Sequence, residues 1–185
     1  VGNEKGFAGE TNWSLLKRAD FAPGAADREA LNVGQEDGTH WLPAEVDVSI
    51  RPGWYYHEAE DSLVRTVPQL LDIYYASVGR NASMLLNVPP DKTGRIPAVD
   101  SLRLMEFVRA LAAEFSKDLA ADARVSASNV RGHSGKYGAM RVTDGDTATY
   151  WATDDDVRNA SLTVMFDQPT VFNRLLVQEY IPLGQ

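Results

Sequence analysis

The sequence contains no cysteine among its 185 residues. That absence excludes a disulfide framework, a thiolate nucleophile and a zinc site with cysteine ligands. No apolar run approaches the roughly 20 residues that a membrane-spanning helix needs, so we expect no membrane span. Basic residues are also few, with 18 lysines and arginines against 26 acidic residues and a formal net charge of -8. Because phosphate binding needs a basic surface, nucleic acid is a poor candidate for a partner.

Two short segments carry the first regular patterns. Residues 44–50 alternate apolar and polar side chains, as a β-strand does, and a Pro-Gly turn then delivers residues 54–57 to a loop. From Ser62 onward the apolar residues recur at intervals of three and four, which predicts a helix with Thr66 as its N-cap and Gly79 as its C-cap. The apolar positions expected on its buried face are Leu63, Val67, Leu70, Leu71, Tyr74, Tyr75 and Val78.

The same alternation of strand and helix then repeats. Residues 84–88 form a short apolar run closed by two prolines, which is typical of a buried strand in a parallel sheet. Asn87 in this run is better placed to bind backbone than a ligand. A second helix is predicted from about Asp100, with an apolar stripe of Leu104, Val108, Leu111 and Phe115. This order predicts the α/β class up to about residue 121.

The pattern changes after residue 121, and we place a domain boundary there. Residues 122–185 contain short runs rich in β-branched and aromatic residues, separated by Gly, Asp and Pro, which is typical of an antiparallel β-sandwich. The runs are 124–128, 149–153, 161–166 and 174–181. They are too few to close a sandwich, so only its beginning is expected.

Several motifs in the first 118 residues stand in the order found in a known family. They are Gly2-Asn3-Glu4, Thr11-Asn12-Trp13, residues 41–57 (WLPAEVDVSIRPGWYYH), residues 77–81 (SVGRN) and residues 85–90 (LLNVPP). Together they resemble the α-L-fucosidases of glycoside hydrolase family twenty-nine, and within it the subgroup that prefers α-1,3- and α-1,4-linked fucose. Residues 142–151 (VTDGDTATYW) resemble the opening half of a discoidin-like carbohydrate-binding module.

The resemblance implies which fold the chain adopts, and it implies that the chain holds only part of that fold. Residues 1–121 would be the C-terminal part of a (β/α)8-type barrel, and residues 122–185 a partial discoidin-like β-sandwich. A sheet that closes on itself is not stable as an open remnant. We therefore expect the native protein to extend further on both sides.

The resemblance also implies a retaining exo-α-L-fucosidase, which uses one carboxylate as nucleophile and a second as acid/base. The family's nucleophile is an Asp in a Trp-Phe-Asp-Gly segment that is missing here, so we expect the nucleophile upstream and no hydrolysis by this chain alone. The acid/base maps to Glu4, for which a solvated loop carboxylate is the alternative. A non-catalytic carbohydrate-binding protein with a barrel-like shell and a discoidin-like module is the rival function.

Four more residues are candidates for contact with the sugar. The resemblance implies that Trp54 packs on the apolar face and methyl group of fucose, with a core aromatic as the alternative. Glu45 either faces the substrate or forms an ion pair with Arg51 or another barrel arginine. His57 is a candidate for the acceptor hydroxyls and Trp13 for the acceptor subsite, with structural roles as the alternatives.

Asp144, Asp146 and Thr149 crowd oxygen donors onto one glycine-containing turn. Calcium takes about 6 to 8 such ligands, and the discoidin-like resemblance implies a structural calcium here, with a metal-free turn as the alternative. No catalytic cofactor is implied. The implied partners are fucosylated oligosaccharides or glycoconjugates, and the implied location is the bacterial periplasm or the outside of the cell.

Overall fold

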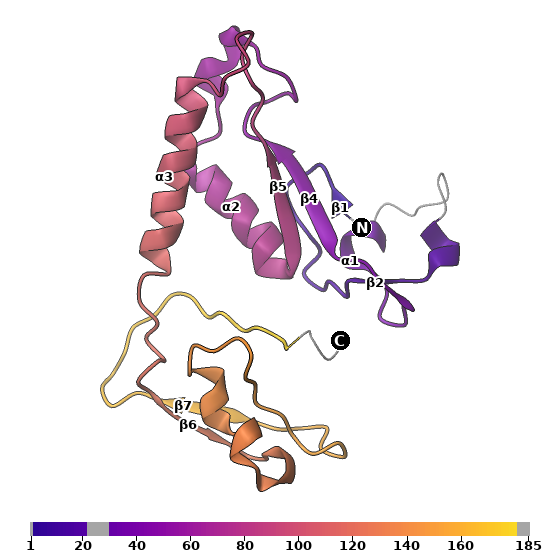
Figure 1. Cartoon of the computed structure of the whole chain (residues 1–185), viewed down its shortest axis with the longest axis vertical. Helices are drawn as coiled ribbons and strands as arrows, with labels where there is room; N and C mark the ends of the chain where they lie inside the picture. The colour runs from indigo at the N-terminus through magenta and orange to yellow at the C-terminus, as the bar shows by residue number, and fades with distance from the viewer. Residues whose placement is uncertain (1, 22–29, 181–185) are drawn as a thin grey trace. The chain divides into compact units, whose positions relative to one another are not determined.

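The computed structural model describes residues 2–21 and 30–180 and divides into two compact units, Val1–Glu114 and Phe115–Gln185 (Figure 1). The first unit is built on a three-stranded parallel sheet in the order β1-β4-β5, formed by β1 (Gly2–Asn3), β4 (Ala44–Ser49) and β5 (Ala82–Asn87). Helix α2 (Val67–Ser77) connects β4 to β5, and helix α3 (Ala98–Glu114) follows β5. The predicted α/β class is therefore confirmed for this unit.

Smaller elements surround this sheet. They are α1 (Ala30–Val33), the antiparallel pair β2 (Leu15–Leu16) and β3 (His40–Trp41), and the 3-10 helices Arg18–Phe21, Glu58–Leu63 and Val78–Arg80. None of the described helices is both long enough and apolar enough to cross a membrane.

The core lies on one face of the parallel sheet. Along β4 the side chains of Ala44, Val46 and Val48 are buried while Glu45 is exposed, which is the alternation predicted for residues 44–50. Helices α2 and α3 supply the apolar partners of this face. The larger cluster consists of Ile50, Val64, Leu70 and Phe107, with Leu71, Tyr74, Met84, Leu86, Val88, Val99, Leu104 and Leu111 packed against it.

Helix α2 begins where its capping residues dictate. The Thr66 side chain accepts a hydrogen bond from the Gln69 N–H, and the Gln69 side chain accepts one from the Thr66 N–H, which satisfies two free donors of the first turn. Thr66 as N-cap is therefore confirmed. The expected burial of Leu63 is wrong, because Leu63 lies in a separate 3-10 helix, Glu58–Leu63, and is 57% exposed.

The predicted end of this helix is also wrong. The α-helix stops at Ser77, with Val78 as its C-cap, and Gly79 lies inside the following 3-10 helix. The left-handed residue that ends this segment is Asn81, with φ of 61°. Asparagine tolerates that conformation better than most non-glycine residues, so it takes the place predicted for glycine.

Helix α3 is confirmed, but its buried stripe is rotated from the predicted one. Leu104 and Leu111 pack on the core as expected, whereas Val108 is 55% exposed and Phe115 lies beyond the helix. The buried residues are Asp100 and Phe107. Positions 100, 104, 107 and 111 follow the helical repeat. The stripe that packs on the core is therefore the one that carries Phe107.

In the second unit, two of the four predicted strands form. They are β6 (Arg124–Ala127) and β7 (Leu162–Met165), which pair antiparallel. Residues 149–153 and 174–180 form no strand, and residue 181 lies outside the described residues. The backbone of Ala152 bonds to Arg131 and Tyr137 in neighbouring turns, which leaves it no strand partner. Those turns contain the 3-10 helices Arg131–His133, Gly135–Tyr137 and Ala139–Val142.

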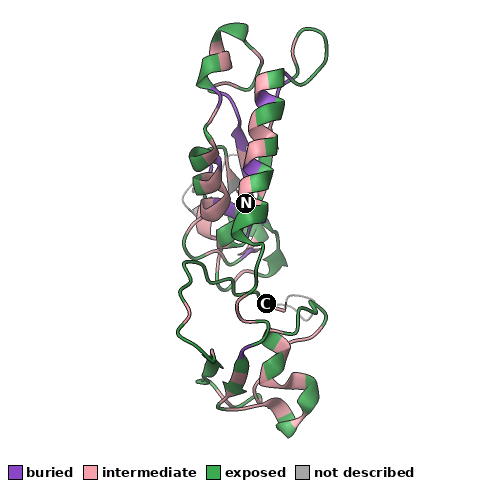
Figure 2. Ribbon diagram, turned by 90° about the vertical axis from the view of Figure 1, so that its left-hand side faces the viewer, coloured by how far each residue is buried: buried purple, intermediate pink, exposed green. Residues whose placement is uncertain are grey.

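The two units differ in how much they bury. Figure 2 shows buried residues gathered on the strands and helices of the first unit, while exposed residues dominate the second. Ala123 is the one buried apolar residue of the described part of the second unit.

Candidate active site

The carboxyl ends of the parallel strands lie at one edge of the sheet, where ligands bind in α/β folds. Strands β4 and β5 end level with each other, at Ser49 and Asn87. Glu4 is the first residue after β1, and the loop that follows β4 carries Trp54 and His57. Three of the predicted site residues thus follow the carboxyl ends of neighbouring strands.

Glu4 leaves the sheet before β4 ends. Asn3 is level with Val46, so β1 ends three residues short of the end of β4. Asn3 holds this turn, because its amide donates to the Phe7 carbonyl at 2.7 Å and its Oδ1 accepts from the Lys5 N–H at 2.7 Å. Glu4 itself is exposed, and its carboxylate bonds to no side chain or backbone group within the described ranges. The turn is therefore ordered while the carboxylate is available to a ligand.

Other motif residues attach the chain after Glu4 to the helical layer. The Ala8 N–H donates to the Ala76 carbonyl at 2.7 Å, and Arg80 Nη1 donates to the Ala8 carbonyl at 2.8 Å. The Asn12 amide donates to the carbonyls of Arg80 and Asn81, at 3.0 and 3.1 Å. Asn12 and Arg80 are thus anchors of the loop, which explains their place in the motifs.

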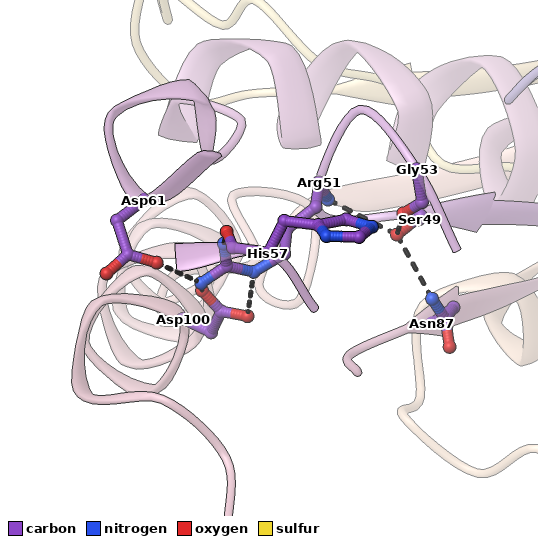
Figure 3. Close-up of polar contacts among 7 residues, drawn as sticks. All are labelled: Ser49, Arg51, Gly53, His57, Asp61, Asn87 and Asp100. Atoms are coloured by element: carbon purple, nitrogen blue, oxygen red, sulfur yellow. Dashed lines mark hydrogen bonds and ion pairs between the residues drawn. The ribbon is translucent and has the colours of Figure 1, made fainter. Parts of the chain in front are cut away.

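The loop after β4 is attached to the strand ends by two polar side chains (Figure 3). The Ser49 hydroxyl donates to the Gly53 carbonyl at 2.7 Å. The Asn87 amide donates to Ser49 Oγ at 3.1 Å and to the Trp54 carbonyl at 3.0 Å. Asn87 binds the backbone, as its position in the sequence predicted. Trp54 is 38% exposed in this chain.

A buried ion cluster holds the other end of this loop. Arg51 is fully buried and donates to both carboxylate oxygens of Asp100, from Nε at 2.8 Å and Nη2 at 2.7 Å. Its guanidinium also bonds to Asp61 at 2.8 Å and to the His57 carbonyl at 3.3 Å, and it lies over the Tyr56 ring. The hydrogen bonds to Asp100 raise the pKa of Arg51 above its ordinary value, so the cation persists despite burial.

Glu45 stands apart from this cluster. Arg51 pairs with Asp61 and Asp100, so the predicted alternative of a Glu45–Arg51 ion pair is wrong. Glu45 is the second residue of β4, level with Gly2. It lies four residues before the strand ends, which is about 13 Å along the strand. Its exposed side chain is on the face opposite the apolar core.

Trp13 and Trp54 lie at opposite ends of strand β4. Trp41 lies in β3, three residues before β4 begins, and the Leu42 N–H donates to the Ser14 carbonyl next to Trp13. Trp13 is therefore at the amino end of β4, whereas Trp54 follows its carboxyl end. Trp13 and Trp41 are 39% and 61% exposed. The His57 side chain is exposed as well.

Asp144, Asp146 and Thr149 do share one turn, but they are bonded to each other. Asp144 accepts from the Asp146 N–H at 3.0 Å and from Thr149 Oγ1 at 2.7 Å, and it pairs with Arg141 at 3.3 Å. These bonds lower the pKa of Asp144, with the Asp146 N–H as the largest cause. The described residues assemble no group of three or more acidic or histidine side chains able to hold a metal. The three residues are thus held to one another by hydrogen bonds within the turn.

The comparisons with known proteins identify the family. The sequence matches the α-L-fucosidase family over residues 20–113, and the chain belongs to that family. It is 40% identical to α-L-fucosidase 1 of Arabidopsis thaliana over its whole length, which is 36% of that protein. The match to an Oryza sativa protein assigned as α-L-fucosidase 1 has the same identity and also covers 36% of the relative. The chain thus spans about a third of the length of these curated relatives.

Solved structures give the same result. A structure from Bacteroides thetaiotaomicron assigned as an α-L-fucosidase has a TM-score of 0.84 and 40% identity, over 90% of this chain and 36% of that one. A GH29 fucosidase of Ruminococcus gnavus, solved in complex with fucose, has a TM-score of 0.77 and 34% identity, over 89% of this chain and 33% of that one.

Proposed function

We propose that this chain is part of a retaining exo-α-L-fucosidase that removes α-1,3- or α-1,4-linked fucose from oligosaccharides or glycoconjugates. The observation that carries the proposal is the place of Glu4, an accessible carboxylate directly after β1 in a chain of the α-L-fucosidase family. The fucose complex of the Ruminococcus gnavus relative supports fucose as the sugar.

In the proposed mechanism Glu4 acts twice. As an acid it gives its proton to the glycosidic oxygen while the nucleophile, an Asp upstream of this chain, attacks the anomeric carbon of fucose. As a carboxylate it then takes a proton from the water that displaces this nucleophile and releases fucose. Retention requires the two carboxyl groups to lie about 5 to 5.5 Å apart. The experiment that tests this role is the replacement of Glu4 in the full-length protein, with activated and natural substrates compared.

The sheet of the first unit would then be the C-terminal part of a (β/α)8-type barrel. On the face of β4 that carries Glu45, the Glu45 side chain is exposed in this chain, whereas the opposite face is buried by α2 and α3. A barrel strand is packed on both faces, so the missing strands would supply the cover. The β6–β7 pair would be the start of a discoidin-like sandwich, whose remaining strands would cover the exposed second unit. A glycan substrate favours the periplasm or the cell exterior.

Trp54 would form part of the fucose pocket. Its partly exposed ring follows the carboxyl end of β4, and an indole face suits the methyl group and apolar face of a deoxy sugar. Trp54→Ala in the full-length protein is expected to weaken fucose binding by about 1 to 3 kcal/mol through lost burial and stacking. Titration calorimetry with fucose measures this loss. An unchanged affinity, or global unfolding of the variant, would contradict the assignment.

A structural Ca²⁺ at Asp144, Asp146 and Thr149 stays a proposal and needs more oxygen ligands than these three residues supply. A metal that binds only the folded state stabilises it by mass action. In the full-length protein, chelator is therefore expected to lower the melting temperature and added Ca²⁺ to restore it. The Asp144→Asn variant should no longer respond to Ca²⁺. A melting temperature indifferent to chelator would mean that the turn is held by its own hydrogen bonds.

A further inference from the structure

The side-chain donors of Ser49 and Asn87 are all used. Both N–H groups of the Asn87 amide are used, one on the Trp54 carbonyl and one on Ser49 Oγ. The Ser49 hydroxyl donates to the Gly53 carbonyl and accepts from Asn87 and from the Arg51 N–H, which uses its donor and both its acceptor positions. Ser49 is buried and level with Asn87 across the β4–β5 ladder. We call these two residues and their bonds the Ser49–Asn87 clamp.

The clamp holds the backbone on both sides of Trp54. The Gly53 carbonyl belongs to the peptide unit before the Trp54 Cα, and the Trp54 carbonyl belongs to the unit after it. Because each peptide unit is planar, holding both units restricts φ and ψ of Trp54 and with them the direction of its Cα–Cβ bond. The indole is then left with only its side-chain rotamers.

Among the described residues, little else orients this ring. Trp54 is 38% exposed, and its ring makes no aromatic contact or hydrogen bond with any residue that the structure describes. Core packing, which fixes most tryptophans, is therefore weak here. We infer that Ser49 and Asn87 are positioning residues that aim the Trp54 indole at the bound sugar. The inference rests on the proposed function, in which Trp54 contacts fucose.

A double-mutant cycle in the full-length protein tests this inference. Asn87→Ala removes both donors, so fucose affinity measured by calorimetry is expected to fall about 2- to 10-fold. In a Trp54→Ala background the same change should alter the affinity by less than about twofold, because the ring that it positions is gone. An equal loss in both backgrounds, or no loss in the unmutated background, would overturn the inference.

A matched variant separates positioning from general destabilisation. Thr66→Ala removes the cap of α2 in the same unit and touches neither Trp54 nor the clamp. It is expected to lower the melting temperature without changing fucose affinity. If Thr66→Ala weakened fucose binding as much as Asn87→Ala, loss of stability would explain both results and the positioning role would be wrong.

Hydrogen exchange distinguishes failure of the clamp from failure of the proposed function. Asn87→Ala should speed amide exchange in residues 53–57, and Thr66→Ala should not. Unchanged exchange in this segment would overturn the clamp. Faster exchange in a protein that binds no fucose would leave the clamp standing as a device that holds the loop, and would overturn the proposed function instead.

Discussion

Glu4→Gln in the full-length protein is expected to slow the hydrolysis of natural fucosylated glycans by about 10² to 10⁴-fold. The leaving group of such a glycan is a sugar hydroxyl, which departs poorly unless it is protonated. An aryl fucoside with an acidic phenol as its leaving group needs no proton in the first step, so its first step should be slowed much less. Steady-state and burst kinetics on the two substrates measure the difference. A uniform loss on both substrates would contradict the acid role.

Glu45→Gln is the matched control for this prediction. Both residues are exposed glutamates of the first unit, but Glu45 lies near the start of β4, about 13 Å along the strand from its carboxyl end. We expect Glu45→Gln to show no dependence on the leaving group. If Glu45→Gln showed that dependence while Glu4→Gln stayed active, Glu45 would be the acid/base and the assignment of Glu4 would be wrong.

Asp100→Ala is expected to destabilise the protein by about 3 to 5 kcal/mol, because it leaves the buried Arg51 cation without its main partner. Both side chains are fully buried, and two hydrogen bonds are lost at once. Asp100 is also the third residue of α3, where a carboxylate interacts favourably with the helix N-terminus. Urea unfolding of the full-length protein measures the change in the free energy of unfolding.

Asp61→Ala provides the comparison on the same arginine. The Asp61 side chain is 44% exposed, so solvent screens its ion pair and its loss should cost about 1 kcal/mol or less. Equal losses of stability for Asp61→Ala and Asp100→Ala would contradict the assignment of Asp100 as the main counter-ion of Arg51. In that assignment the Asp61 ion pair contributes less.

The parts of the fold that depend on local spacing were predictable from the sequence. The alternation in residues 44–50 predicted β4, and Thr66 predicted the start of α2, because strand faces and helix caps are set by residues close in sequence. The strand predicted for residues 149–153 does not form. Their β-branched and aromatic composition suits a strand, but a strand also needs a partner, and the backbone of Ala152 bonds to turns instead.

The positions of the candidate site residues along the strands were predictable only where the motifs indicated them. Glu4 and Trp54 follow strand ends that the sequence indicates. The pairing of Arg51 with Asp100 joins residues 49 positions apart, and the sequence offered Glu45 as one alternative partner of Arg51. The bond from Asn87 to the Trp54 carbonyl depends on the level pairing of β4 with β5, which no local pattern reveals. A signal for both existed, since a buried arginine needs a carboxylate and an asparagine at a strand end needs a carbonyl.

The chemistry of azide with the Glu4→Ala variant tests the central claim most directly. Removal of the acid/base leaves space for azide beside the fucosyl-enzyme, and azide attacks without needing a general base. With an activated aryl fucoside, azide is therefore expected to restore turnover of Glu4→Ala in the full-length protein and to yield a fucosyl azide of α configuration, identified by NMR. Azide that gives no rescue of Glu4→Ala, but rescues Glu45→Ala to the same α product, would contradict the account.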